Sequence, residues 1–203
     1  MFEKHKGILF VLSSPSGGGK TTLAKILSQK DPTLFLSISV TTRVMRPFDV
    51  DGRDYCFLTE DAFKRALQDG TFLETSESFG NFYATPRAPI EQALLLGKDV
   101  LLILNEEGYR IIKTQFPFHT VGIFLLPPSL DVLKHRLLTR AGNDKTLDQR
   151  LAEVMSQMRS CKEYDYCVIN ENLTEAAKNL RIIITAERQK TARLQSLDHN
   201  KDL

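Results

Sequence analysis

A glycine-rich segment near the start of the chain has the residue types that bind the phosphates of a nucleotide. It follows a short apolar run, Ile8 to Leu12, and precedes Leu23, Ile26 and Leu27 at helical spacing. Glycines let successive backbone N–H groups point at one anion, a lysine reaches the outer phosphates, and a hydroxyl can bind Mg²⁺. We therefore predict a nucleoside-triphosphate site, with Thr21 as the metal ligand, formed by Ser14, Pro15, Ser16, Gly17, Gly18, Gly19, Lys20 and Thr21.

One position departs from the strict pattern of such loops, which have glycine where this chain has Ser14. The departure is tolerable if that residue only begins the turn. A loop that merely turned a strand into a helix would not explain why Lys20 is followed by two threonines.

A second group of polar side chains follows the loop. Arg43 and Arg46 are three residues apart, and Tyr55 and Tyr83 come after them. Directed donors of this kind can hold a dianionic phosphate, and arginine can do so through two bonds. A carboxylate such as Glu74 can accept hydrogen bonds from the donor edge of a base. Each residue alone is more often packing or solvated surface, but their order after a phosphate loop favours a second nucleotide site.

These segments make the chain resemble the guanylate kinase family from about residue 6 to residue 188. The matching motifs are Ser14-Pro-Ser-Gly-Gly-Gly-Lys-Thr, Ser39-Val-Thr-Thr-Arg-x-x-Arg-Pro, Val50-Asp-Gly-x-Asp-Tyr, Phe72-Leu-Glu, Gly80-Asn-x-Tyr-x-Thr-Pro, Phe124-Leu-Leu-Pro-Pro-Ser, Glu163-Tyr-Asp-Tyr and Asn170. The resemblance implies transfer of the γ-phosphoryl group of ATP to GMP or dGMP, giving ADP and GDP or dGDP, with Mg²⁺. It also implies the P-loop nucleoside monophosphate kinase fold, with a core, a GMP-binding insert and a mobile lid.

The resemblance implies particular roles as well. The residues implied to contact the GMP phosphate are Ser39, Arg43, Arg46, Tyr55 and Tyr83. Those implied to contact the guanine are Glu74, Thr85 and Asn105. The implied catalytic set, which with Mg²⁺ would neutralise the transferring group, is Lys20, Arg43, Arg136, Arg140 and Arg150. On their own, the last three arginines would be typical of a solvated helix face.

Two departures from the family pattern lie at the end of a predicted core strand. The family has an acidic residue where this chain has Ile103, and aspartate where it has Asn105. The first loss weakens any simple assignment of a carboxylate that supports Mg²⁺. The second leaves one neutral acceptor for the guanine 2-amino group, and the NH₂ of Asn105 would oppose guanine's donors if it faced them.

The elements that must position these residues follow an α/β pattern. Continuous apolar runs predict buried strands of a parallel sheet at 8–12, 100–104, 121–126 and 167–169. Apolar spacing predicts helices at about 107–114, 130–138, 146–161 and 173–188. Strands alternating with helices indicate a parallel sheet with helices on both faces.

The segment from Ser39 to about Pro86 breaks this rhythm. It is Thr-rich and aromatic, with strand-like pieces around 55–58 and 80–83, and favours a small inserted subdomain. We therefore expect residues 1–203 to form a single guanylate kinase-like domain. Its expected parts are a core at about 6–38, 88–135 and 147–188, a GMP-binding insert at about 39–87, a lid at about 136–146 and a polar tail at about 189–203.

Composition excludes several classes of protein. Hydrophobic residues make up 42% and charged residues 26% of 203 residues, values typical of globular domains and not of disordered chains. The net charge of +2 provides no overall basic field for binding nucleic acid or membrane. The partners we expect are therefore the small molecules ATP and GMP or dGMP, with no nucleic acid, no membrane, and a monomeric or homodimeric chain.

The cysteines and the first residues bear on location. Cys56, Cys161 and Cys167 have neither zinc-site nor redox-pair spacing, which predicts buried thiols in a reducing compartment. The first apolar run has five residues, too few for a secretory signal or a membrane helix. We expect a soluble cytoplasmic protein.

Two alternative functions remain to be weighed. Another small nucleoside or nucleotide kinase would share the phosphate loop, but the set Glu74, Tyr83 and Thr85 argues against it. A non-catalytic module of the kind found in scaffold proteins keeps the GMP-site residues, binds phosphorylated peptides and loses the phosphate loop. The glycines and Lys20 of this chain argue against that alternative.

Overall fold

The computed structural model describes residues 7–15, 17–78, 80–129, 131–133 and 157–191. Its larger sheet has the strand order β2-β7-β1-β8-β9, and all neighbouring strands in it are parallel. The strands are β1 (Leu9–Ser13), β2 (Leu34–Leu36), β7 (Asp99–Ile103), β8 (Thr120–Leu126) and β9 (Tyr166–Ile169). The predicted α/β class with a parallel sheet is confirmed.

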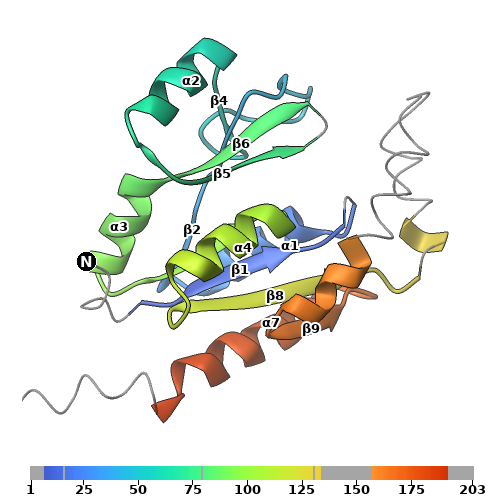
Figure 1. Cartoon of the computed structure of the whole chain (residues 1–203). Coiled ribbons are helices and arrows are strands. Elements are labelled where there is room, and N and C mark those ends of the chain that lie inside the picture. Colours follow the sequence, from blue (N-terminus) through green and yellow to red (C-terminus); the bar gives the residue numbers. More distant parts are fainter. Residues whose placement is uncertain (1–6, 16, 79, 130, 134–156, 192–203) are drawn as a thin grey trace, which may run out of the picture.

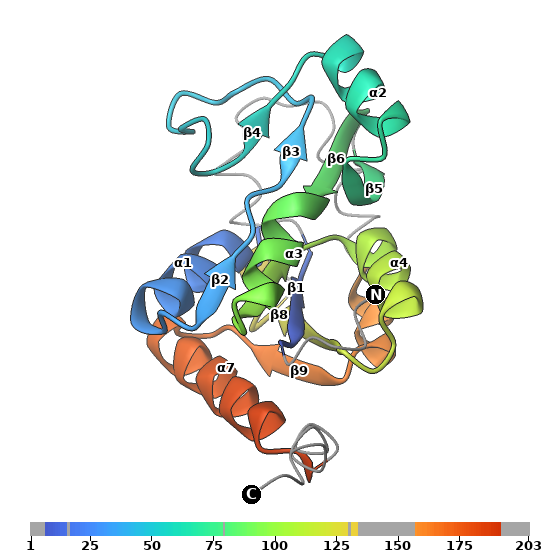
Figure 2. The ribbon, with the colours of Figure 1, turned by 90° about the vertical axis from the view of Figure 1, so that its left-hand side faces the viewer.

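Helices cover both faces of this sheet (Figure 2). On one face, α1 (Lys20–Lys30) and α7 (Leu173–Arg188) share an apolar cluster with Phe10 and Leu12 of β1. On the other, α3 (Arg87–Leu95) and α4 (Glu106–Gln115) share a cluster with Leu9 and Val11. Successive side chains of a strand point to opposite faces, so the continuous apolar run of β1 serves both layers.

A second, smaller sheet lies on the α4 side of the molecule, at the top of Figure 1. Its strand order is β4-β3-β6-β5, formed by β3 (Val40–Thr41), β4 (Cys56–Phe57), β5 (Phe72–Ser78) and β6 (Asn81–Pro86). Helix α2 (Glu60–Gln68) contributes Phe63 to an apolar cluster with Val40 and Ala84. This sheet therefore has a small core of its own, inserted between β2 and α3.

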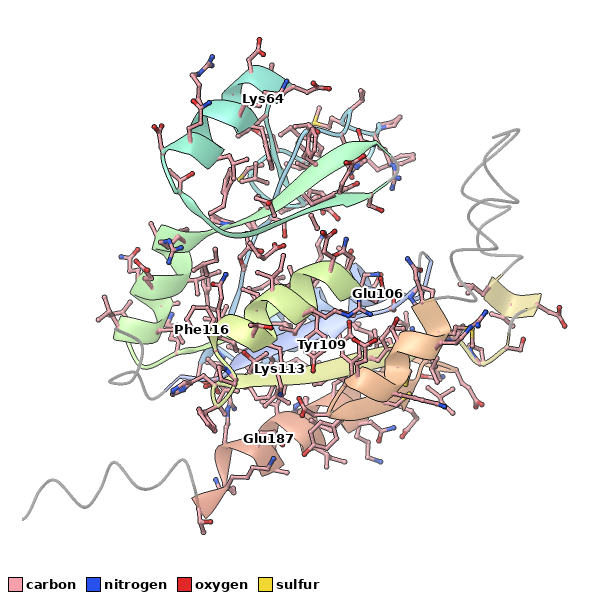
Figure 3. All side chains as sticks on the ribbon, viewed as in Figure 1. Lys64, Glu106, Tyr109, Lys113, Phe116 and Glu187 are labelled. Atoms are coloured by element: carbon pink, nitrogen blue, oxygen red, sulfur yellow. The ribbon has the colours of Figure 1, made fainter. Side chains whose placement is uncertain are left out.

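Helix α4 lies between the two sheets and contacts both. It begins after Asn105, whose side chain accepts a hydrogen bond from the Gly108 N–H, and its first turn is acidic, as suits the positive end of a helix dipole. Figure 3 shows Tyr109 pointing from α4 toward β8, and its ring stacks on that of Tyr164 at a centroid distance of 4.0 Å. The start of α4 is thus fixed both by its cap and by aromatic packing.

The structure adds elements that the apolar pattern did not predict. Strand β2 has three residues, which is too short for a periodic signal, and it pairs with β7 at the edge of the larger sheet. Helices α2 and α3 and strand β5 were also not predicted. The predicted helices at 130–138 and 146–161 lie mostly outside the described residues, which include a short helical segment that ends in the 3₁₀ turn η2 (Ser160–Glu163).

The prediction of buried cysteines is wrong, because none of the three thiols is fully buried. Cys56 and Cys161 are half-buried, whereas Cys167 is exposed, and all three are free thiols. Cys167 lies on the edge strand β9, where the neighbouring Val168 takes the inward position. Within the described ranges, every helix is too short or too polar to span a bilayer.

Candidate active site

A cleft of about 250 Å³ lies at the carboxyl ends of β1 and β7, facing the smaller sheet. It brings together the predicted residues Ser14, Gly17, Lys20, Thr21, Ser39, Arg43, Arg46, Tyr55, Glu74, Tyr83 and Asn105. It is also lined by Ser76, Ser78, Ile103, Leu104 and Gln157. Ligands of open parallel sheets bind at this edge. Among the described lining residues the charges are three cations against the carboxyl of Glu74, so the cleft favours an anion.

The glycine loop connects β1 to the N-terminus of α1, as predicted from its spacing. Gly19 has a φ of +94°, in the left-handed region. A Cβ there would also lie 2.6 Å from Nδ2 of Asn170, which donates a 2.8 Å hydrogen bond to the carbonyl oxygen of Gly18. Asn170 is buried at the end of β9, so the far edge of the sheet holds the loop in its shape.

Lys20 is the first residue of α1 and turns back over the loop. Its Nζ donates to the carbonyl oxygen of Ser14 at 2.6 Å and to Ser14 Oγ at 3.1 Å. The ammonium group therefore stands at the mouth of the loop, where phosphates would meet α1. Glu106, labelled at the start of α4 in Figure 3, lies close enough to feel the charge of Lys20. Burial raises the pKa of Glu106 above its usual value, and the charge of Lys20 opposes part of that rise.

Arg43 is held in place from several directions. Its Nη2 donates to Asp49 Oδ2 at 2.9 Å, and its Nη1 donates to the carbonyl oxygen of Val44 at 2.8 Å. Its Cζ lies 5.3 Å from the ring centroid of Tyr55 and 5.4 Å from that of Phe57. These contacts order a long side chain before any phosphate arrives, which lowers the entropy that binding must overcome.

The other predicted phosphate contacts surround Arg43. Tyr55 and Tyr83 meet edge to face, with ring centroids 6.0 Å apart. Burial raises the pKa of Tyr55, so its hydroxyl stays protonated and can donate. Ser39 and the exposed Arg46 line the same end of the cleft. Five donor side chains of three kinds, a serine, two arginines and two tyrosines, therefore converge there.

Glu74 stands apart as a buried carboxyl. It pairs across β5 and β6 with Thr85, whose hydroxyl donates to Glu74 Oε1 at 2.5 Å. Glu74 Oε2 is buried and has no hydrogen-bond partner among the described residues. Burial raises the pKa of Glu74 to about 7, opposed by the Thr85 hydrogen bond and reinforced by the charge of Glu107. An unmatched buried acceptor is costly, so Oε2 is a place for a ligand's donor.

Gly108 allows α4 to approach this carboxyl. A Cβ at Gly108 would lie 2.8 Å from Glu74 Oε2 and 3.3 Å from Asn105 Oδ1. The same Oδ1 accepts the 2.9 Å hydrogen bond from the Gly108 N–H. The Asn105 oxygen, which the resemblance implies as an acceptor for guanine, thus also caps the start of α4.

Some predicted residues do not lie in the described part of the cleft. Arg136, Arg140, Arg150 and Ser16 fall outside the described residues. Thr85 is buried behind Glu74 and reaches the cleft through that side chain. Ile103 lines the cleft with a hydrocarbon side chain, which offers no ligand to a cation.

Sequence reasoning missed two supporting residues. Asp49 accepts from the guanidinium of Arg43 and from the backbone N–H of Arg46 at 2.8 Å. Burial alone would raise the pKa of Asp49, but these hydrogen bonds and the two arginine charges hold it below its usual value. An acid three residues after Arg46 was the available signal. Asn170, seen in the sequence only as part of a motif, had no local signal because its partner is Gly18.

Comparisons with known proteins agree with this geometry. A family model described as guanylate kinase matches residues 6–187. Guanylate kinases from Nitrosospira multiformis and Rhodopseudomonas palustris (strain ATCC BAA-98 / CGA009) are 45% and 42% identical over 92% and 96% of this chain, and 89% of each relative. A crystal structure of guanylate kinase from Anaplasma phagocytophilum superposes with a TM-score of 0.80 at 32% identity, over 96% of this chain and 95% of that one. The chain therefore belongs to the guanylate kinase family.

Proposed function

We propose that the cleft binds the phosphate of GMP through Ser39, Arg43, Arg46, Tyr55 and Tyr83, and its guanine through Glu74, Thr85 and Asn105. As a member of its family, the protein transfers the γ-phosphoryl group of ATP to GMP, giving ADP and GDP. The observation that supports the residue assignments is one cleft that joins a phosphate loop, a cluster of cations and an unpartnered carboxylate oxygen. We expect dGMP to be a second acceptor.

Glu74 suits guanine because of that base's donors. Guanine presents N1–H and the 2-amino group side by side, and adenine lacks this pair. The ionised carboxylate accepts from both, and Oε2, which has no partner among the described residues, gains one. We place the substituent at C2 of the purine toward Asn105, because the cleft side of Glu74 Oε2 adjoins the start of α4.

Phosphoryl transfer needs alignment and charge more than covalent help from the protein. The loop N–H groups and Lys20 orient the phosphates of ATP, while Arg43 and the tyrosines aim an oxygen of GMP at the γ-phosphorus. Lys20 and Arg43 then stabilise the charge that spreads over the transferring group. We propose that Arg136, Arg140 and Arg150, which lie outside the described residues, complete this positive surround.

The donor set of the cleft fits a magnesium ion that arrives with ATP. The described residues contain no cluster of three or more His, Cys, Asp or Glu side chains that could hold a metal. Mg²⁺ prefers water and phosphate oxygens with one or two protein ligands. Thr21, exposed at the start of α1 and lining the cleft, would hold it. The ion would supply further charge neutralisation at the phosphates.

The setting of the reaction follows from its chemistry. We propose a cytoplasmic location, which suits three free thiols and substrates of nucleotide metabolism. A monomer or a homodimer stays our prediction for the assembly.

The test is ADP release in a coupled assay with ATP, Mg²⁺ and GMP. Lys20→Ala should reduce turnover about a thousandfold, because a charge that contacts the transferring phosphate is lost. Lys30→Ala, at the other end of α1, is the matched control and should keep turnover within about twofold. Near-normal turnover of Lys20→Ala would contradict the assignment of the phosphate loop.

A further inference from the structure

The oxygen of the Asn105 side chain accepts a hydrogen bond from the protein's own backbone. Its Oδ1 receives the Gly108 N–H at 2.9 Å, and this bond caps the first turn of α4. An amide side chain has one oxygen and one NH₂ group, so a bond from an N–H determines which of the two faces the helix. The group that remains is Nδ2, a donor, and no hydrogen bond joins it to another of the described residues.

Asn105 lies beside the unpartnered oxygen of Glu74. Both side chains line the cleft. Both also lie close to Gly108: a Cβ on that residue would be 2.8 Å from Glu74 Oε2 and 3.3 Å from Asn105 Oδ1. A base that donates to Glu74 Oε2 therefore meets the Asn105 amide as its next neighbour.

We propose that Asn105 sets the base specificity of this enzyme by presenting a donor to the C2 substituent of the purine. The nucleotides that accept the phosphoryl group then include, beside GMP, two 6-oxopurine nucleoside monophosphates without a 2-amino group. These are the hypoxanthine and xanthine nucleotides, IMP and XMP. This inference rests on the orientation proposed above, in which Glu74 meets N1–H and Asn105 meets C2.

The three bases share the 6-oxo group and N1–H and differ at C2; the carbonyl of xanthine at C2 is accompanied by an ionisable N3–H. Each carries N1–H, which Glu74 accepts. Guanine has an amino group at C2, hypoxanthine a hydrogen and xanthine a carbonyl oxygen. An amino group opposite Nδ2 meets another donor, whereas a carbonyl oxygen there meets a matching partner. GMP therefore gains less from its amino group here than it would beside a free carboxylate.

Two substitutions separate the effect of the Asn105 NH₂ donor from that of the oxygen that caps α4. Asn105→Asp keeps the cap, because aspartate accepts from the Gly108 N–H equally well, and it turns a second carboxylate oxygen toward C2. Asn105→Ser also keeps a capping residue, but it removes the amide donor. The test measures the dissociation constants of GMP, IMP and XMP by calorimetry for both variants and the wild type. It also measures kcat/KM for each nucleotide with ATP. The pH is 8.5, above the pKa of Glu74 of about 7, so that its carboxyl is ionised.

We expect Asn105→Asp to raise the ratio of kcat/KM for GMP to that for IMP about tenfold. The same substitution should lower the ratio of kcat/KM for XMP to that for IMP by a similar factor. Asn105→Ser should weaken XMP relative to IMP while leaving the ratio of GMP to IMP within about threefold. Equal changes for all three nucleotides, or unchanged ratios in both variants, would overturn the proposal. A wild type that releases no ADP with GMP would instead overturn the proposed function itself, so the two failures are distinct.

Discussion

At Glu74, burial favours the neutral acid, whereas the proposed contact with guanine needs the ionised carboxylate. Burial raises its pKa from 4.5 to about 7, the Thr85 hydrogen bond lowers it, and the Glu107 charge raises it. Between these two pH values the folded protein binds more protons than the unfolded chain. We therefore predict that the free energy of unfolding falls as pH rises from about 4.5 to 7, by about 3 kcal/mol at most.

Glu74→Gln isolates this effect, because it cannot ionise. Urea unfolding from pH 5 to pH 8 should show a flatter pH dependence than the wild type and a more stable protein at pH 8. Glu77→Gln, an exposed carboxyl on the same strand, is the matched control and should keep the wild-type slope. A slope that survives in Glu74→Gln would show that another group titrates.

Asp49 acts on the phosphate end of the cleft without lining it. Asp49→Asn keeps the shape but removes the charge that holds the guanidinium of Arg43 at 2.9 Å. We predict that the KM for GMP rises about three- to tenfold, because Arg43 must be ordered by the substrate instead, and that kcat changes less than twofold. Steady-state kinetics check this, with the exposed Asp69→Asn of the same subdomain as the control. An unchanged KM would mean that Tyr55 and Phe57 position Arg43 without Asp49.

At the scale of the elements, the end of α7 is tied to the larger sheet by Arg188. Its Nε donates to Asp99 Oδ2 at 2.6 Å, its Nη1 to Asp31 Oδ2 at 2.8 Å and its Nη2 to Thr33 Oγ1 at 3.1 Å. Asp99 is 8% exposed and also accepts from the Ile8 N–H at 2.8 Å. This network joins α7, β7 and the end of α1.

Arg188→Met would leave the buried carboxylate of Asp99 without its cation. We predict a loss of about 2 kcal/mol in the free energy of unfolding, discounted from fully buried pairs because Arg188 is partly exposed. Lys178→Met, which removes an exposed pair with Glu175 on the same helix, should cost less than about 1 kcal/mol. Equal losses in the two variants, measured by urea unfolding, would show that the network adds nothing specific.

The apolar runs predicted β1, β7 and β8 to within a residue because these strands are covered on both sides. Strand β2 could not be predicted in this way, since its three residues join the sheet through pairing with β7. The predicted site residues on β5 and β6 came from motifs and not from periodicity. The role of Asn105 shows a different limit: asparagine before two acids is a helix-cap pattern, but the sequence does not say whether its oxygen serves the helix or the base.

At the scale of the whole molecule, an ion pair connects helix α1, which packs on the larger sheet, with the inserted segment that carries the smaller sheet. Lys25 of α1 contacts Asp54, which lies in the segment between β3 and β4 and also accepts from Arg53 and from the Val50 N–H. Hydrogen bonds from Lys25 and Val50 hold the pKa of Asp54 well below its usual range. The contact therefore restrains the inserted sheet relative to the core.

Lys25→Met should change the free energy of unfolding by less than about 1 kcal/mol, because the lysine is partly exposed. We predict a larger effect on conformation: X-ray scattering of the free enzyme should give a greater radius of gyration than for the wild type. Saturation with GMP and an unreactive ATP analogue should bring both proteins to the same smaller radius. Identical radii of the free proteins would contradict this role for the pair.

The bond from Asn170 to the carbonyl oxygen of Gly18 has a consequence for synthesis. The loop leaves the ribosome well before β9, the strand of the larger sheet that supports it, and β1 lies between β7 and β8, which also emerge later than β1. At about 5–20 residues per second, roughly 8–30 s separate the two ends of that bond. Until β7 and β8 have emerged, the apolar residues of β1 lack their neighbours in the sheet, so this strand is open to aggregation or to chaperone binding during synthesis.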